Sequence, residues 1–232
     1  MILLASASPR RHELLEALGF RFAVMPAEAD ESSRPGEAPA ELAVRLAATK
    51  AMAVAGTQHD ALVVAADTLV VLDGDILGKP ADADDAAGML GRLRAREHQV
   101  MTGLALVDPA AGRMLMQLAT TGVAMRSYSQ AEIDAYVATG DPLDKAGAYA
   151  IQHAVFAPVS RLEDCYANVV GLPLCHLVRG LRLLGIEAPR HPLEACPYAV
   201  EHGGCPWSEP ILDEPAARWA RHHPADPADG AS

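Results

Sequence analysis

Residues 3–15 read Leu-Leu-Ala-Ser-Ala-Ser-Pro-Arg-Arg-His-Glu-Leu-Leu. The apolar run stops at small hydroxyl residues, where Ser8 is placed as the N-cap of a helix that begins at Pro9. Free backbone N–H groups at such a helix start, together with the guanidinium groups of Arg10 and Arg11, form an anion-binding site. The stretch therefore predicts a strand that leads into a helix, with a phosphate-binding turn between them.

The rest of the chain alternates short apolar runs with helical patterns, which is typical of an α/β fold. Strands are expected at 2–5, 61–66, 100–107 and 114–125, and helices at 9–18, 39–55, 82–93, 129–138 and 174–184. Residues 23–38 are expected to form a mobile loop. Residues 69–72 are expected to continue extended into Asp73-Gly74, which signals a hairpin. We expect one domain over residues 1–187, with a central mixed, twisted sheet flanked by helices.

The composition changes near residue 188, where proline and histidine become frequent and apolar periodicity fades. We expect residues 188–232 to form an irregular, poorly ordered C-terminal extension. Cysteine and histidine at mixed spacing could bind zinc, and the candidates in the extension are His191, Cys196, His202 and Cys205. No close Cys-x-x-Cys or His-x-x-x-His pair is present, so a loosely ordered tail is favoured.

Composition excludes several classes of protein. The 232 residues carry a net charge of -11, which argues against a protein that coats nucleic acid. No run of about 18 apolar residues is present, so no membrane span is expected. The N-terminus begins a strand and has no signal-peptide pattern, which predicts a cytoplasmic protein. In that compartment Cys165, Cys175 and the two later cysteines are expected to be free thiols.

Four polar clusters lie at the edges of expected core elements. They are Ser6 with Arg10 and Arg11, Asp67 with Thr68 at the C-terminal end of a buried strand, Lys79 between glycine and proline, and the segment 144–152. Cations that hold phosphates and a carboxylate that binds a divalent ion or activates water suit phosphoryl or nucleotidyl chemistry. Each cluster also has a plainer explanation, as a solvated helix face, a turn or cap residue, or an exposed lysine. No Gly-x-x-x-x-Gly-Lys-Ser/Thr phosphate loop is present.

Six segments in order resemble the Maf family of nucleoside triphosphate pyrophosphatases over roughly residues 1–186. The matching segments are Leu4–Leu15, Ala66–Thr68, Gly78–Pro80, His98–Gly103, Asp144–Gln152 and Asn168–Leu174. The resemblance implies a Maf/ITPase-like fold and hydrolysis of a nucleoside triphosphate to the monophosphate and pyrophosphate. It also implies a divalent cation, Mg²⁺ or Mn²⁺, as cofactor, and it allows a homodimer.

The resemblance assigns roles to individual residues. Asp67 would be the proton acceptor that activates water, and it would share the metal with Glu31. Contacts to the triphosphate would come from Ser6, Arg11, Lys50 and Lys79. Arg11, Lys79 and Glu31 are also counted as catalytic.

The resemblance further points to the dTTP/UTP pyrophosphatases of the family, through Arg10, Thr68 and Gln152. A glutamine amide offers both a donor and an acceptor, which suits the imide edge of uracil or thymine. Residues 153–155, His-Ala-Val, depart from the glycines that the family usually has there. Two other functions stay open: a weakly active nucleotide-binding regulator of cell division, and a pyrophosphatase for purine or 7-methyl-GTP triphosphates.

Overall fold

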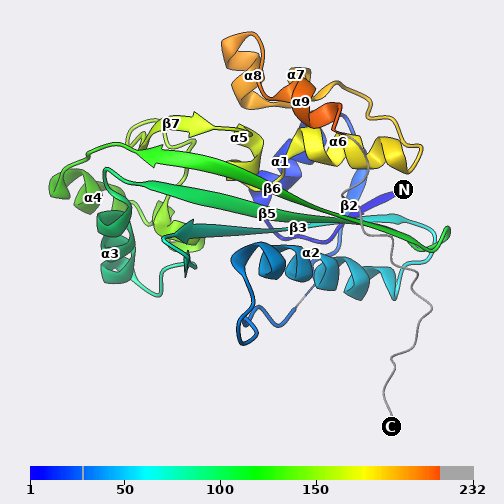
Figure 1. Cartoon of the computed structure of the whole chain (residues 1–232), viewed down its shortest axis with the longest axis horizontal. Coiled ribbons are helices and arrows are strands. Elements are labelled where there is room, and N and C mark those ends of the chain that lie inside the picture. Colours follow the sequence, from blue (N-terminus) through cyan, green and yellow to red (C-terminus); the bar gives the residue numbers. More distant parts are fainter. Residues whose placement is uncertain (28, 215–232) are drawn as a thin grey trace.

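The computed structural model describes residues 1–27 and 29–214 of the chain. Its centre is a seven-stranded mixed sheet with the order β2-β1-β3-β5-β6-β7, to which β4 adds by pairing with β3 (Figure 1). The strands are β1 (Ile2–Leu4), β2 (Phe22–Val24), β3 (Leu62–Leu72), β4 (Asp75–Leu77), β5 (Glu97–Asp108), β6 (Arg113–Met125) and β7 (Val159–Glu163). β1 runs parallel to β2 and β3, and the other pairs are antiparallel. The expected mixed sheet flanked by helices is confirmed.

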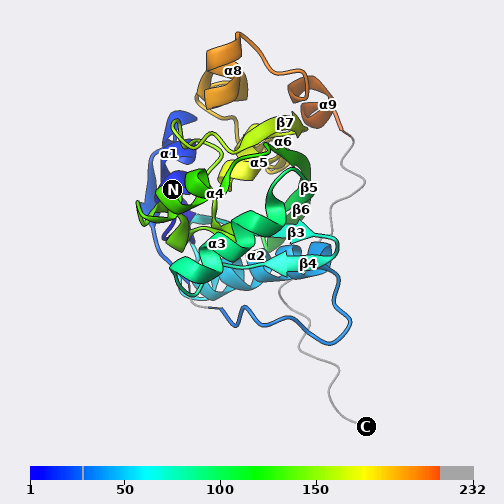
Figure 2. The ribbon, with the colours of Figure 1, turned by 90° about the vertical axis from the view of Figure 1, so that its left-hand side faces the viewer.

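Helices cover both faces of this sheet (Figures 1 and 2). On one face lies α2 (Pro39–Ala55), and on the other lie α1 (Pro9–Ala17), α5 (Tyr166–Val170) and α6 (Leu174–Leu183). Side chains alternate along β3, so that Val63 packs in the core under α2 while Val64 packs in the core under α1 and α6. A strand covered on both faces reads as a continuous apolar run, which explains the sequence pattern before Asp67.

A third core closes the far end of the long strands. It lies between the sheet, α3 (Ala83–Leu93) and α4 (Gln130–Val137), and Figure 1 shows both helices at that end. Two short 3₁₀ turns follow α4, at Asp141–Asp144 and Ala146–Ala148. The expected capping box of α4 is present, because Ser129 and Glu132 bond to each other's backbone N–H groups.

Strand β3 is longer than the sequence indicates. We expected a buried strand over 61–66 that ends on Asp67 and a separate extended stretch over 69–72, whereas β3 is one strand from Leu62 to Leu72 with Asp67 in its middle. On one side β3 pairs with β5 throughout this region, but on the other it pairs with β1 only up to Val64 and with β4 only from Val70. Residues 65–69 therefore border a gap in the sheet, just beyond the carboxyl end of β1.

The structure also differs from the expected irregular tail over residues 188–214. This part forms α7 (Pro192–Ala195), α8 (Pro197–His202) and α9 (Ser208–Leu212). Its apolar residues, among them Ala199 and Ile211, are buried against the core under α1 and α6, so that the core of the main domain orders them. The remainder of the expected tail, residues 215–232, lies outside the described residues. Within the described ranges no helix is long and apolar enough to cross a membrane.

Candidate active site

The gap in the sheet opens into a cavity of about 900 Å³. Because Asp67 and Thr68 are consecutive strand residues, their side chains leave β3 on opposite faces, and the gap joins both faces into one cavity. All the residues that we proposed for the site line this cavity: Ser6, Arg10, Arg11, Glu31, Lys50, Asp67, Thr68, Lys79 and Gln152. The structure thus brings together residues from α1, α2, β3, the turn between β1 and α1, and the segments after β2, β4 and α4.

Arg11 is fixed by three hydrogen bonds on the α1 side. Its Nε donates to the carbonyl of Gly171 (2.8 Å), and its two terminal nitrogens donate to Ser6 Oγ (3.2 Å) and Thr68 Oγ1 (3.0 Å). Burial lowers the pKa of Arg11, and the nearby charge of Asp67 opposes this shift. The guanidinium is a cation at any physiological pH, so it presents a fixed positive charge to the cavity.

The turn between β1 and α1 is built as the sequence predicts. Ser8 is the N-cap residue and Pro9 the first helical residue, but the Ser8 side chain makes no capping hydrogen bond. The Ser8 amide instead donates to Ser6 Oγ (3.2 Å). The first-turn N–H groups of α1 are therefore not capped by Ser8, and the turn lines the cavity as an anion-binding helix start.

On the α2 side, one ammonium group lies between two carboxylates. Lys50 Nζ donates to Asp67 Oδ1 (2.5 Å) and to Glu31 Oε1 (2.8 Å). Burial acts to lower the pKa of Lys50, but the charge of Asp67 and the hydrogen bonds to both carboxylates outweigh it, so the pKa is raised. The same contact with Lys50 lowers the pKa of Glu31. Both Lys50 and Glu31 are therefore charged at neutral pH.

Lys79 is exposed at the rim, and its charge also helps to lower the pKa of Glu31. The residue before it, Gly78, accepts a hydrogen bond from the Gly147 amide (3.0 Å), which ties the rim to the 144–152 segment. Gly147 has φ +68°, and a Cβ there would stand 2.9 Å from Val70 Cγ1. Glycine is required at this crossing both for its backbone conformation and for the close approach of β3.

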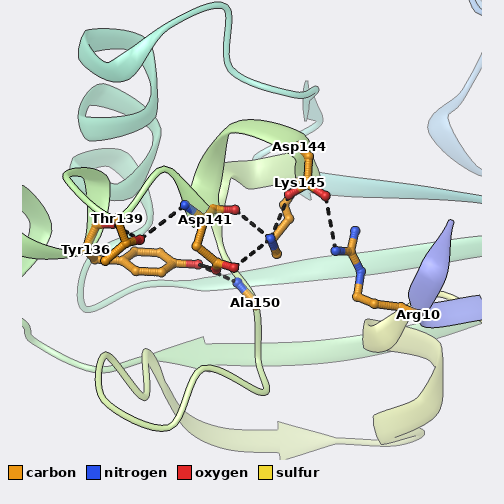
Figure 3. A network of polar contacts seen from close by, with 7 residues as sticks. All are labelled: Arg10, Tyr136, Thr139, Asp141, Asp144, Lys145 and Ala150. Carbon is orange, nitrogen blue, oxygen red and sulfur yellow. Dashed lines mark hydrogen bonds and ion pairs between the residues drawn. The ribbon is translucent and has the colours of Figure 1, made fainter. Parts of the chain in front are cut away.

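A buried network holds the segment that carries Gln152 (Figure 3). The ammonium of Lys145 donates to Asp144 (2.7 Å) and Asp141 (3.0 Å), and Asp144 also pairs with Arg10 at 3.5 Å. The Tyr136 hydroxyl donates to Asp141 (2.6 Å) and accepts from the Ala150 amide (3.1 Å). Sequence reasoning included Lys145 in a motif but missed Tyr136 and Asp141, although two aspartates one and four residues before a buried lysine are a recognisable pairing signal.

The described residues contain no group of three or more His, Cys, Asp or Glu side chains that is placed to hold a metal ion. The zinc site considered for His191, Cys196, His202 and Cys205 is thus not formed. Asp67 and Glu31 remain as two carboxylates that converge on one cation, the Lys50 ammonium. A pair of this kind can hold Mg²⁺ where substrate phosphates and water complete the coordination.

Comparison with known proteins agrees with this geometry. A family model described as "Maf-like protein" matches residues 1–184. A dTTP/UTP pyrophosphatase of Pelotomaculum thermopropionicum and one of Geobacter metallireducens are each 50% identical over 184 residues, which cover 79% of this chain and 96% of each relative. A protein of the same name from Dehalococcoides mccartyi is 44% identical over 190 residues, or 82% of this chain and 85% of the relative. The chain belongs to the Maf-like protein family.

Proposed function

We propose that this chain is a nucleoside triphosphate pyrophosphatase that hydrolyses dTTP and UTP to the monophosphate and pyrophosphate. The observation that carries the proposal is a buried carboxylate, Asp67, placed in one cavity with the fixed cation Arg11 and the helix start of α1. The names of relatives at 44–50% identity support the choice of substrate. A cytoplasmic enzyme that acts on the nucleotide pool is the role that we infer for it.

The triphosphate would lie along the turn between β1 and α1. Arg11 is held by Ser6, Thr68 and Gly171, so little side-chain entropy is lost when it binds a phosphate. Lys79 is exposed at the opposite rim and would close on the phosphates as a second cation. Charge spread over the phosphate oxygens in the transition state is stabilised by such preorganised cations.

Asp67 would take the proton from the attacking water. Its side chain is about 10% exposed, and its Oδ1 accepts a hydrogen bond from the Lys50 ammonium. A carboxylate can act as a general base only while it is ionised and within hydrogen-bond reach of the water. Lys50 therefore serves to fix the orientation of the Asp67 carboxylate.

A divalent cation, Mg²⁺ or Mn²⁺, belongs to the same proposal. Asp67 and Glu31 would hold it, because both carboxylates contact a single cation in the structure. When bound, such an ion neutralises phosphate charge and increases the acidity of a coordinated water.

Base selection would rest on Gln152, Arg10 and Thr68. Gln152 lines the cavity, and the Lys145 network fixes the backbone just before it. Residues 153–155, where this chain departs from the usual glycines, do not line the cavity, and Val155 is 91% exposed. The departure therefore lies outside the pocket that we propose for the base.

The test is the variant Asp67→Asn, assayed for pyrophosphate release from dTTP and UTP with Mg²⁺. The amide keeps the shape of the carboxylate but cannot accept the proton, so turnover should be abolished while nucleotide binding, measured by calorimetry, is largely kept. Asp60→Asn, which changes an exposed carboxylate before β3, is the matched control and should be fully active. Normal turnover by Asp67→Asn would remove Asp67 as the base, and stoichiometric orthophosphate as the first product would refute the reaction.

A further inference from the structure

Two motif segments of the sequence, His98–Gly103 and Asn168–Leu174, meet beside the cavity and have no role in the proposed function. The Thr102 hydroxyl on β5 donates a hydrogen bond to the carbonyl of Asn168 on α5 (3.3 Å). Both residues are fully buried, and neither lines the cavity. Burying a polar group costs free energy unless it is hydrogen-bonded, so such side chains need their partners in place.

Thr102 is connected to Arg11 through Thr68. Thr68 and Thr102 lie directly opposite each other on β3 and β5, and their hydroxyl oxygens are 2.9 Å apart. Thr68 Oγ1 also accepts a hydrogen bond from a terminal nitrogen of Arg11 (3.0 Å). A continuous line of three hydrogen bonds therefore runs from the guanidinium to the backbone of α5.

The direction of the hydrogen bonds in this line follows from the groups at its ends. An arginine side chain can only donate, and a carbonyl oxygen can only accept. A threonine hydroxyl carries one hydrogen, and Thr102 gives its hydrogen to the Asn168 carbonyl. Thr68 must therefore donate to Thr102, which leaves the Thr68 oxygen as an acceptor for Arg11.

The Asn168 side chain fixes the far end of the line. Its amide nitrogen donates to the carbonyl of Val100 on β5 (3.0 Å) and to Thr121 Oγ1 on β6 (2.9 Å). The Thr121 hydroxyl in turn donates to the carbonyl of Cys165, just before α5 (3.1 Å). Because the Val100 carbonyl can only accept, the amide nitrogen of Asn168 must face it. Helix α5 is thus tied to two strands of the sheet.

Helix α5 also leads to the second partner of Arg11. It ends at Val170, and the carbonyl of the next residue, Gly171, accepts the hydrogen bond from Arg11 Nε (2.8 Å). Thr102 therefore contacts both supports of the guanidinium. It bonds to the Thr68 hydroxyl directly, and through the Asn168 carbonyl it bonds to the helix that precedes Gly171.

We propose that Thr102 is a positioning residue for Arg11: it sets the Thr68 hydroxyl as an acceptor and so holds the guanidinium in the orientation that binds the triphosphate. This inference rests on the proposed function, in which Arg11 contacts the phosphates. A group whose partners are fixed before the substrate arrives loses little freedom on binding. Displacement of such a group by about 1 Å can lower the rate by about 100-fold.

The test compares Thr102→Val with Thr121→Val in the full chain. Both variants remove a fully buried hydroxyl that donates to a backbone carbonyl of the α5 segment, so both should lower the melting temperature by a few degrees. Only Thr102→Val releases the Thr68 hydroxyl. We expect kcat/KM for dTTP to fall about tenfold in Thr102→Val and to stay within about twofold of the wild type in Thr121→Val.

Hydrogen exchange of the Arg11 Nε–H, followed by NMR without nucleotide, reports directly on how firmly the guanidinium is held. The signal is identified by its absence from Arg11→Lys. Its exchange should be at least about tenfold faster in Thr102→Val and unchanged in Thr121→Val. Because this measurement needs no hydrolysis, it decides the inference even if the chain is inactive on dTTP and UTP, in which case the proposed function alone fails.

Thr102→Ser keeps the hydroxyl and loses only the methyl group, so it should retain wild-type exchange at Arg11 although the chain is less stable. If Thr102→Val does not fold, as judged by circular dichroism, Thr102→Ala takes its place, since it differs from Thr102→Ser only by the hydroxyl. Three results would each overturn the proposal: wild-type exchange in the variant without the hydroxyl, equally fast exchange in Thr121→Val, or fast exchange in Thr102→Ser.

Discussion

At Gly103 on β5 the backbone of α2 lies close against the sheet, and this contact offers a sharp test of the fold. A Cβ on Gly103 would stand 2.1 Å from the carbonyl oxygen of Ala43 and 2.6 Å from the amide nitrogen of Val44. Ordinary contact begins at 3.4 Å, so α2 would have to move away by about 1.3 Å. The obstacle is helix backbone, which cannot rotate aside as a side chain can. We therefore expect Gly103→Ala to lower the free energy of unfolding by about 3 kcal/mol, the upper end for overpacking.

For a chain of this size, that loss lowers the melting temperature by about 6–12 °C. Activity should fall as well, because α2 carries Lys50, the partner of Asp67. The assays are thermal unfolding and pyrophosphate release from dTTP. Gly88→Ala on α3 is the matched control, since a Cβ there meets nothing within 4 Å and alanine is the better helix former. A Gly103→Ala chain that melts with the wild type and keeps full activity would refute this account of the α2 contact.

Three further outcomes follow from the site and its supports. Lys50→Met removes the ammonium between Asp67 and Glu31 and should lower kcat for pyrophosphate release by about 100-fold. An unchanged kcat would show that Lys50 is not needed for turnover. Tyr136→Phe removes the hydroxyl that joins Asp141 to the Ala150 amide. The kcat/KM for dTTP, divided by the kcat/KM for purine triphosphates, should therefore fall about tenfold. If this ratio does not change, the network has no part in base selection. Burial lowers the pKa of His98 from 6.5 to about 4, so its neutral form contributes to stability above pH 6.5 and this contribution is lost as the pH falls toward 4. The free energy of unfolding, measured with urea, should fall by up to about 3 kcal/mol between pH 6.5 and pH 4. In His98→Phe the free energy of unfolding should fall less over the same pH range.

Local signals predicted several elements around the cavity correctly. The start of α1 at Ser8 and Pro9, the full length of α2 and the Asp73-Gly74 hairpin all match the structure. Each depends on residues that are close in sequence: a cap and a proline, an uninterrupted helical pattern, and a turn in which both residues have positive φ. The motif segments then identified which side chains belong to one cavity, and all of them line it.

These local signals could not predict how strands pair across long sequence separations. β3 could not be recognised as one strand through Asp67, because a carboxylate and a threonine interrupt its apolar run. β2 and β7 were missed because they are short, partly exposed edge strands without a clear alternation of buried residues. The helices of the extension have too few apolar positions to show a period, and they are ordered by a core that other elements supply.

The gap beside β3 explains how charged and polar residues come to lie in the middle of a central strand. In a fully paired sheet, Asp67 and Thr68 would project into two separate apolar cores, and an ionised carboxylate there would be strongly disfavoured. Because β1 pairs with β3 only up to Val64 and β4 pairs with it only from Val70, both side chains instead reach one polar cavity from opposite faces. One short stretch of strand can then place the Asp67 carboxylate beside Lys50 of α2 and the Thr68 hydroxyl beside Arg11 of α1, and the rigidity of the sheet sets the distance between the two contacts. The interruption of the sheet is therefore the structural requirement of the site.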